Sequence, residues 1–402
     1  MFDARLDLLQ TLTLSAVVYF VGIQLRQRIA WIDRLNIPAA VVGGLVFTAL
    51  AMLARDRLVN IQLDTTAQPV LSVAFFTSIG MGASLALLRR GGIHVAIFLA
   101  FATAFCFVQN FIGIGIARAF GESPLLGVMA GSVTLVGGPA TGMAFAPVFE
   151  TAGLAGAGVL ALAAATMGIV FGGLTGSPAG TFLIKRKGLR STVVSPAEMR
   201  AELDTPEPAL VVEVEQEDSP LIRHMVVLAL AMGIGSVVSR WIGSLGITLP
   251  AYIGAMLVAS VLRNVDDKTG FFKIDQRAME FIGNLALNIF LTVALMDLKL
   301  WQLADVALPL IVIIVAQVLV VVLAALTVSF VIMGRDYDSA VMASGFIGFV
   351  LGTTANAVAN MRALVARFGP APRAFLVVPL VGAFFIDFTN AIIITFFVNW
   401  LS

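Results

Sequence analysis

Ten long apolar segments dominate this sequence of 402 residues and restrict what the chain can fold into. They cover residues 7–25, 37–54, 69–88, 92–117, 156–184, 221–242, 247–262, 279–298, 305–333 and 375–401. A helix that spans a bilayer needs about 20 largely apolar residues. Only 12% of the residues are charged, against about 25% in soluble proteins. The sequence therefore predicts an all-α integral membrane protein with about ten spanning helices.

Two further apolar stretches, residues 124–147 and 338–361, carry helix-weakening residues. The first contains Gly-Gly-Pro at 137–139, which disfavours a continuous helix because glycine is flexible and proline lacks an N–H. Non-helical backbone at membrane depth persists only where protein buries it or where it lines a wet cavity. We therefore expect two re-entrant segments that face each other and hold a small solute. The alternative, favoured for Gly127 and Gly131, is that small residues only let helices pack closely.

The two halves of the chain carry similar motifs in the same order. Residues 37–39 correspond to 249–251, 75–77 to 290–292, 128–130 to 341–343, and Gly168 to Gly382. Because each half contributes five spans, the second half must be inverted, which is typical of secondary transporters. We expect an N-terminal repeat over 1–185, an acidic cytoplasmic linker over 186–220 and a C-terminal inverted repeat over 221–402. The alternative is that the repeat reflects ancestry only.

The basic residues predict the orientation. If the N-terminus lies outside and both broken segments return to the side they enter from, 19 of the 25 Lys and Arg residues are cytoplasmic and 6 are outside. Cytoplasmic loops of membrane proteins carry such an excess. We therefore expect both termini on the outer side of the membrane.

The broken segments form the candidate substrate site. At a helix break, free N–H groups and the positive end of the helix dipole attract a carboxylate. The candidate substrate-binding residues are Gly137, Gly138, Thr141 and Gly142 in the first segment and Thr354, Asn356 and Asn360 in the second. The expected cargo is a small solute that carries a carboxylate.

Oxygen-bearing residues near the breaks are candidate sodium ligands, because hard cations prefer oxygen. The candidates are Thr134, Thr353, Asp387 and Asn110. Asp387 lies inside the last apolar segment, where an acid is costly unless it faces a cavity or a partner. It could ligate sodium, carry a proton or accept hydrogen bonds. Alternatively, it is a structural acid satisfied by Thr389 and Asn390.

Other polar residues interrupt apolar segments. Gln109, Asn110 and Gln317 are of the type that more often forms interhelical hydrogen bonds than ligand contacts. Asn284 and Asn288 share a helix face at i, i+4 spacing, which fits either role.

Several chemistries lack the residues they need. There is no HExxH or GxSxG motif, and GGPATG at 137–142 lacks the Lys-Ser/Thr ending of a P-loop. One cysteine and two histidines are too few for a disulfide framework or a histidine metal site. No basic patch with interleaved aromatics is present. We expect no enzyme activity, no prosthetic group, no metal beyond sodium and no nucleic-acid partner.

The motifs resemble the bacterial sodium/glutamate symporter family over nearly the whole chain. The resemblance is densest at residues 75–92, 109–117, 131–142, 299–301, 355–361 and 367–391. It implies sodium-driven uptake of glutamate, ten spans with two re-entrant loops, and a homodimer in the bacterial inner membrane with periplasmic termini. It is also similar to families that move a substrate-holding domain against a fixed dimer scaffold. The family's functional loops map onto Gly137, Gly138, Thr141, Gly142, Thr354, Asn356 and Asn360.

The chain departs from the family pattern beside these loops. Pro139 and Ala140 replace a His-Gly pair, Phe346 intrudes in the second loop, and Asn356 stands where a threonine is usual. The cargo could therefore be another carboxylate or a smaller amino acid. The alternatives in function are a proton-coupled carboxylate transporter, a passive channel, or a sensor built on the same scaffold.

Overall fold

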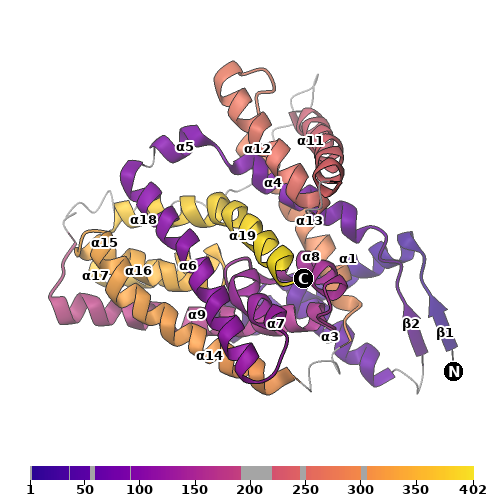
Figure 1. Ribbon diagram of the computed structural model, residues 1–402, viewed down its shortest axis with the longest axis horizontal. Coiled ribbons are helices and arrows are strands. Elements are labelled where there is room, and N and C mark those ends of the chain that lie inside the picture. The colour runs from indigo at the N-terminus through magenta and orange to yellow at the C-terminus, as the bar shows by residue number, and fades with distance from the viewer. Residues whose placement is uncertain are drawn as a thin grey trace.

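The computed structural model describes residues 2–35, 37–54, 59–90, 92–191, 220–244, 250–299 and 306–402. Nearly all of these residues are helical (Figure 1). The described residues also contain a parallel pair of short strands, β1 (Phe2–Arg5) and β2 (Val59–Gln62), which places the start of the chain beside residues 59–62. The helical prediction for the chain is thus confirmed for the described residues.

The first half of the chain contains α1 (Leu8–Arg28), α2 (Ala30–Arg34), α3 (Ala39–Ala54), α4 (Gln68–Gly82), α5 (Leu85–Arg90), α6 (Gly92–Ala119), α7 (Pro124–Val128), the π-helical segment η1 (Met129–Val133), α8 (Gly138–Thr151) and α9 (Ala157–Lys187). The second half contains α11 (Pro220–Gly243), α12 (Ala251–Thr269), α13 (Gln276–Met296), α14 (Ala307–Ala324), η3 (Ala325–Ser329), α15 (Phe330–Ile332), α16 (Tyr337–Val350), α17 (Thr354–Phe368), α18 (Pro372–Leu380), η4 (Val381–Phe385) and α19 (Ile386–Leu401).

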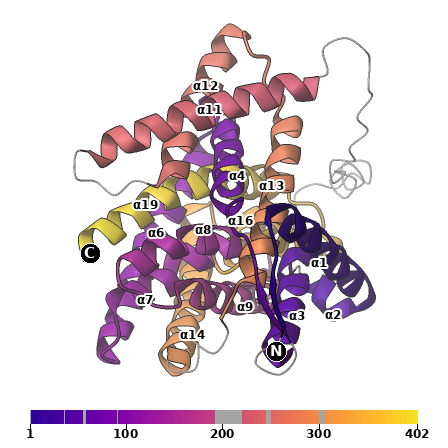
Figure 2. The ribbon, with the colours of Figure 1, turned by 90° about the vertical axis from the view of Figure 1, so that its right-hand side faces the viewer.

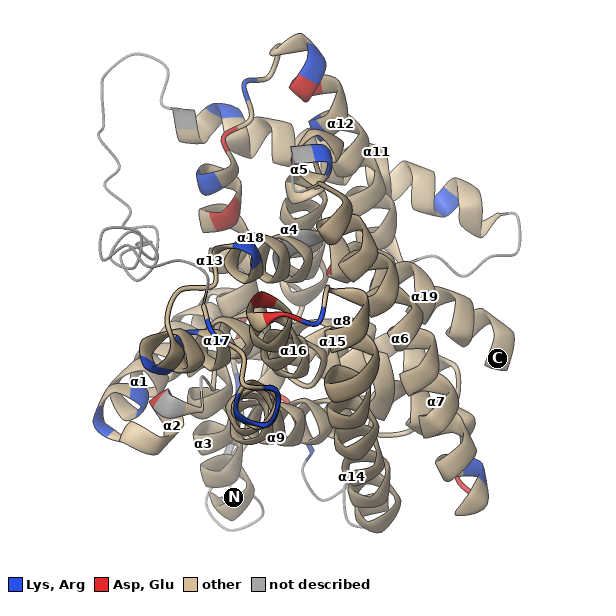
Figure 3. Cartoon of the chain, turned by 90° about the vertical axis from the view of Figure 1, so that its left-hand side faces the viewer, with Lys and Arg blue, Asp and Glu red and all other residues tan. Residues whose placement is uncertain are grey.

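Six of these helices, among the described residues, are long and apolar enough to cross a membrane: α1, α6, α9, α11, α13 and the run from α14 to α15. Four shorter apolar helices cover Ala39–Ala54, Pro124–Val133, Tyr337–Val350 and Ile386–Leu401. In Figure 3 the charged residues gather at helix ends and in connections, while α14 and most of α9 carry none. This arrangement fits a bundle whose flanks lie in lipid.

The helices form two groups that meet along α8 and α13. One group comprises α1, α3, α4, α11, α12 and α13, and the other comprises α6 to α9 and α14 to α19 (Figures 1 and 2). The groups touch where α13 packs on α8 and where α4 packs on η4. The interface between the groups therefore contains α8 and η4 on one side and α13 and α4 on the other.

Some helices cross in backbone contact, and glycine permits this. A Cβ atom on Gly127 of α7 would lie 2.1 Å from the carbonyl carbon of Gly113 in α6, and one on Gly113 would lie 2.1 Å from the oxygen of Gly127. Close approach through small residues is a common way for membrane helices to associate. The packing explanation for Gly127 is thus confirmed.

The predicted linker over 186–220 falls largely on residues 192–219, which lie outside the described residues.

Candidate functional site

The first broken segment consists of α7, η1 and α8. The backbone leaves helical geometry at Gly131, and α8 starts anew at Gly138, whose φ of +67° lies in the left-handed region. Glycine adopts this region without the steric cost that a Cβ brings. Pro139 follows in the first turn, where its missing N–H matters least. The Gly-Gly-Pro sequence thus produces the break that we expected.

The second broken segment consists of α16 and α17. α16 ends at Val350, and α17 starts at Thr354 after an extended Thr353. The Thr353 hydroxyl accepts a 3.4 Å hydrogen bond from the N–H of Asn356, as a helix N-cap does. The break that we expected within residues 338–361 is therefore present.

The two breaks lie against each other. A Cβ atom on Gly138 would lie 3.6 Å from the carbonyl oxygen of Gly352 and 3.7 Å from Cγ2 of Thr353. Sequence segments more than two hundred residues apart thus bring the starts of α8 and α17 together. Both starts line one cavity of about 610 Å³.

The two helix starts give this cavity an anion-attracting wall. In the first turn of a helix the N–H groups have no partner within the helix. Here those groups belong to Gly138 and Ala140 in α8 and to Thr354 and Ala355 in α17, and all four residues line the cavity. Each helix start also carries about half a positive charge from the helix dipole.

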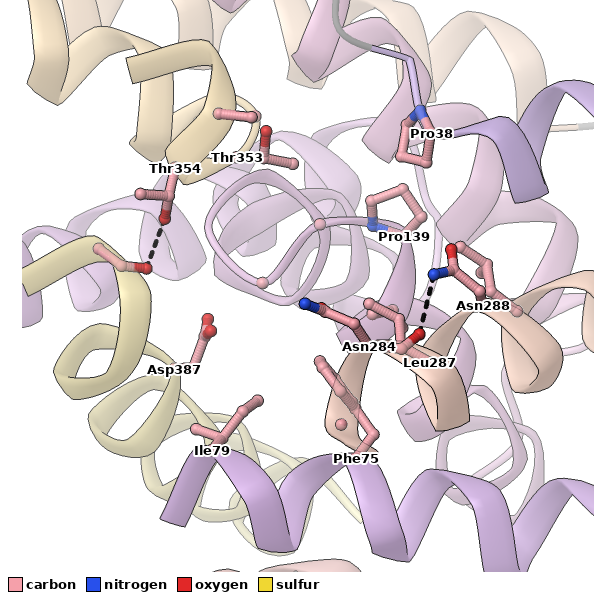
Figure 4. Close-up of a pocket in the computed structure, with 18 of the residues that line it drawn as sticks. Pro38, Phe75, Ile79, Pro139, Asn284, Leu287, Asn288, Thr353, Thr354 and Asp387 are labelled. Carbon is pink, nitrogen blue, oxygen red and sulfur yellow. Dashed lines mark hydrogen bonds between the residues drawn. The ribbon is translucent and has the colours of Figure 1, made fainter. Parts of the chain in front are cut away.

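Asp387 lines the same cavity from α19, as Figure 4 shows. If Asp387 were only a structural acid, Thr389 and Asn390 would have to form hydrogen bonds with it. Both side chains instead bond other groups. Asn390 donates to the carbonyl of Ser132, and Thr389 lies 3.1 Å from the hydroxyl of Thr103. Thr354 donates a 2.6 Å hydrogen bond to the carbonyl of Gly382, which ties the start of α17 to η4 just before Asp387.

The opposite wall comes from α13 and α4. Asn284 and Asn288 both line the cavity, and the Asn288 amide donates a 2.8 Å hydrogen bond to the carbonyl of Asn284 (Figure 4). From the sequence, Asn284 and Asn288 could either join helices or contact a ligand. In the structure, the helix face that they share lines the cavity. Phe75 and Ile79 of α4 add apolar surface. The wall therefore offers amide groups opposite the two helix starts.

The charged residues among the described lining are Arg26, Glu280 and Asp387. Arg26 is paired with Asp33 at 2.9 Å, and both side chains are more than one third exposed. We did not single out Arg26 or Glu280 from the sequence, because each lies near a helix end and resembles an ordinary solvated charge.

Several predicted site residues lie behind the breaks rather than on the cavity. Thr134, buried completely, donates to the carbonyl of Met129. Thr141 packs under Gly137, where an added Cβ would approach its Cβ to 2.4 Å. Gly142 packs on Ala161 of α9 and on Thr134.

The remaining predicted residues bind backbone groups of neighbouring segments. Asn356 donates to the carbonyl of Ile169, and Asn360 donates to that of Gly172, which fastens α17 to α9. The side-chain oxygen Oδ1 of Asn110 accepts from the N–H of Ser132. None of these three asparagines is among the described lining residues.

A second cavity of about 440 Å³ lies further along the same two helices. The C-terminal part of α8, with Glu150, and the end of α13, with Asp297 and Lys299 just beyond it, line it. Burial raises the pKa of Asp297, although the charge of Lys299 opposes this and that of Glu150 adds to it. Both cavities therefore border α8 and α13.

Comparison with known proteins identifies the family of this chain. The family model for the sodium/glutamate symporter matches residues 4–370. The chain is 38% identical over 392 residues to the sodium/glutamate symporter of Escherichia coli (strain K12), which covers 97% of each chain, and equally similar to that of Shigella flexneri. It is 35% identical over 396 residues, or 95% of each chain, to the sodium/glutamate symporter of Haemophilus influenzae. Because the family model and these relatives match most of its length, the chain belongs to the sodium/glutamate symporter family.

Proposed function

We propose that this protein is a secondary active transporter that carries glutamate, or a closely related anionic amino acid, into the cell together with sodium. The observation that carries the proposal is the meeting of two helix starts at one cavity. The relatives that match nearly the whole chain are named for sodium and glutamate. The cargo assignment rests on these relatives and on the charge of the helix starts.

The geometry suggests how glutamate binds. Its two carboxylates match the two helix starts, one at Gly138 and Ala140 and the other at Thr354 and Ala355. Helix N-termini are ready-made anion sites because their N–H groups and dipoles point at the ligand. Asp387 supplies a negative charge for a cation in the same cavity, either the ammonium group of the substrate or a sodium ion.

The residues behind the breaks then have a positioning role. Asn356 and Asn360 hold α17 against α9, and Thr141 supports the turn at Gly137. Thr134, Gly142 and Asn110 support the first break in the same way. These contacts preorganise the N–H groups that meet the substrate.

We further propose ten spans in two inverted repeats, a homodimer in the inner membrane, and periplasmic termini. The two matching broken segments support the repeat, since inverted repeats place such segments at one midplane site. The two cavities along α8 and α13 support alternating access, because each gives the interface between the helix groups an opening of its own.

The direct test is uptake by the purified protein in proteoliposomes. We expect an inward sodium gradient to drive saturable accumulation of radiolabelled L-glutamate, and an equal choline gradient to drive none. A panel with aspartate, 2-oxoglutarate and glycine tests the effect of Pro139 and Ala140 on the cargo. Accumulation that follows a proton gradient without sodium, or unsaturable downhill flux, would show the proton-coupled carrier or the channel instead.

Thr354→Val is expected to raise the apparent KM for glutamate about fivefold. The substitution removes the hydrogen bond to Gly382 without changing the side-chain shape, and such a bond contributes about 1 kcal/mol. Thr354→Ser keeps the hydroxyl and should behave as the wild type in the same uptake assay. Equal KM values for the two variants would mean that this bond does not position the site.

A further inference from the structure

Five buried polar side chains behind the breaks lie on segments that pack on one another, and we call these side chains the amide cluster. It contains Gln109 and Asn110 of α6, Ser132 of η1, Gln317 of α14 and Asn390 of α19. All five are 0% exposed. Burying a polar group without a hydrogen-bond partner is costly. The atoms of these side chains that lack a partner therefore point to a ligand or water that is not part of the chain.

One end of the amide cluster is joined to the end of α16. The Gln109 amide nitrogen donates to the carbonyl of Val350 at 3.3 Å, and the Gln317 amide nitrogen donates to the carbonyl of Gln109 at 2.7 Å. A carbonyl only accepts, so these contacts set the orientation of both side-chain amides. The two side-chain oxygens, Oε1 of Gln109 and of Gln317, have no partner within the described residues.

The other end of the amide cluster is joined to the first broken segment. Ser132 donates its N–H to Oδ1 of Asn110 at 2.9 Å and accepts at its carbonyl from Nδ2 of Asn390 at 2.8 Å. These backbone partners again set which amide atom points where. Oδ1 of Asn390, the hydroxyl of Ser132 and Nδ2 of Asn110 have no partner within the described part of the chain.

The unused groups are mostly acceptors. Three amide oxygens are acceptors only, the Ser132 hydroxyl can accept, and the amide nitrogen of Asn110 is a donor. Orphaned buried atoms in a folded protein call for a ligand, an ion or water. A surplus of neutral oxygens without a carboxylate suits a singly charged hard cation, since divalent ions are usually held by carboxylates.

The amide cluster also lies beside the carbonyl end of α16. Val350 is the last residue of α16, whereas Ser132 directly follows Gly131, where the backbone of the first broken segment leaves helical geometry. The carbonyl end of a helix carries about half a negative charge, which attracts a cation. The substrate cavity takes the opposite, positive ends at Gly138 and Thr354.

We propose that the amide cluster binds a sodium ion, separate from Asp387, with ligands drawn from the oxygens of Gln109, Gln317, Asn390 and Ser132. The inference rests on the proposed sodium-coupled function and deepens it. A cation held there fixes Gln109 and Asn390, whose amide nitrogens bond the carbonyls of Val350 beside the second break and of Ser132 in the first. Sodium binding thereby sets the N–H groups that receive the substrate, which couples the two ligands.

The test is sodium-dependent thermal stabilisation of the purified full-length protein without substrate. Titration with NaCl against choline chloride should raise the Tm of the wild type. Gln317→Leu and Asn390→Leu should each require at least tenfold more sodium for half of that shift. Gln317→Glu keeps the oxygen, adds a charge and should need no more sodium than the wild type. Thr395→Val, which removes a buried hydroxyl already bonded to Ala391 in α19, is the matched control and should titrate as the wild type.

Wild-type sodium titrations for both leucine variants would overturn the inference and mean that the amide cluster holds water only. Asn390→Ser, a smaller change that keeps an oxygen, replaces Asn390→Leu if the latter does not fold, and should show an intermediate sodium requirement. Failure of the proposed function is a different result, namely wild-type uptake that does not depend on sodium. If the wild type shows sodium-driven uptake but the leucine variants titrate with sodium as the wild type does, only the sodium site in the amide cluster is wrong.

Discussion

Asp387→Asn is expected to reduce sodium-driven glutamate accumulation at least about 100-fold. Asp387 lines the cavity between the broken segments, and its neighbours Thr389 and Asn390 bond to other groups. Its carboxylate is therefore available to a cation that enters the cavity. Removing one partner of a buried ion pair costs about 3–5 kcal/mol, and 1.4 kcal/mol is a tenfold change. The measurement is the initial rate of uptake in proteoliposomes under a fixed sodium gradient.

Asp387→Glu is the control, because it keeps the charge and lengthens the side chain by one methylene. We expect it to retain measurable sodium-driven uptake. If Asp387→Asn showed normal sodium dependence and a normal KM for glutamate, the charge of Asp387 would not be required for transport. The sodium requirement would then fall on the amide cluster alone.

Gly137→Ala is expected to lower uptake at least about tenfold while leaving a folded protein. An added Cβ would lie 2.4 Å from Cβ of Thr141 and 2.6 Å from the carbonyl oxygen of Val133. Because one of these atoms is backbone, the turn before α8 must shift. Overpacking of this kind costs about 1–3 kcal/mol, and here the shift moves the N–H groups of Gly138 and Ala140. Uptake rate and glutamate affinity are measured together.

Gly115→Ala in α6 separates this effect from a general change in helix stability. A Cβ there meets nothing within 4 Å, and alanine favours a helix over glycine by about 1 kcal/mol. We expect unchanged uptake and an equal or higher Tm. If Gly137→Ala also transports like the wild type, the turn at the start of α8 is not a rigid part of the site.

The breaks could be predicted from sequence because they are local. Gly-Gly-Pro at 137–139 cannot continue an ordinary helix, and α8 does restart at Gly138. That both breaks and Asp387 share one cavity follows from the constraint that lipid places on unpaired backbone and on charge. Local chemistry and the membrane environment thus lead to the same site.

Other features depend on tertiary packing and could not be read from local patterns. The rotation of α17 about its axis turns Asn356 and Asn360 toward α9, whereas Thr354 and Ala355 face the cavity. The cavity faces of Asn284 and Asn288 likewise depend on how α13 packs beside α8.

The role of Phe346, one of the departures from the family pattern, also depends on tertiary packing and could not be predicted from the sequence. It is completely buried and packs against Phe98, Phe101, Phe105 and Phe349. It is therefore a core residue, and its effect on the substrate cavity passes through Phe349, which lines that cavity.

If the two helix starts form one substrate site, bound glutamate covers both of them, and cysteine labelling measures this. The chain's single cysteine, Cys106, is buried and is changed to serine. Ala140→Cys and Ala355→Cys then place a thiol at each helix start, where both alanines line the cavity. Phe271→Cys, at a side chain that is 79% exposed and away from the cavity, is the control. With sodium present, we expect glutamate to slow maleimide labelling of the first two variants at the same half-maximal concentration and to leave Phe271→Cys unchanged. Protection of only one helix start, or of neither, would show that the two helix starts do not form one substrate site.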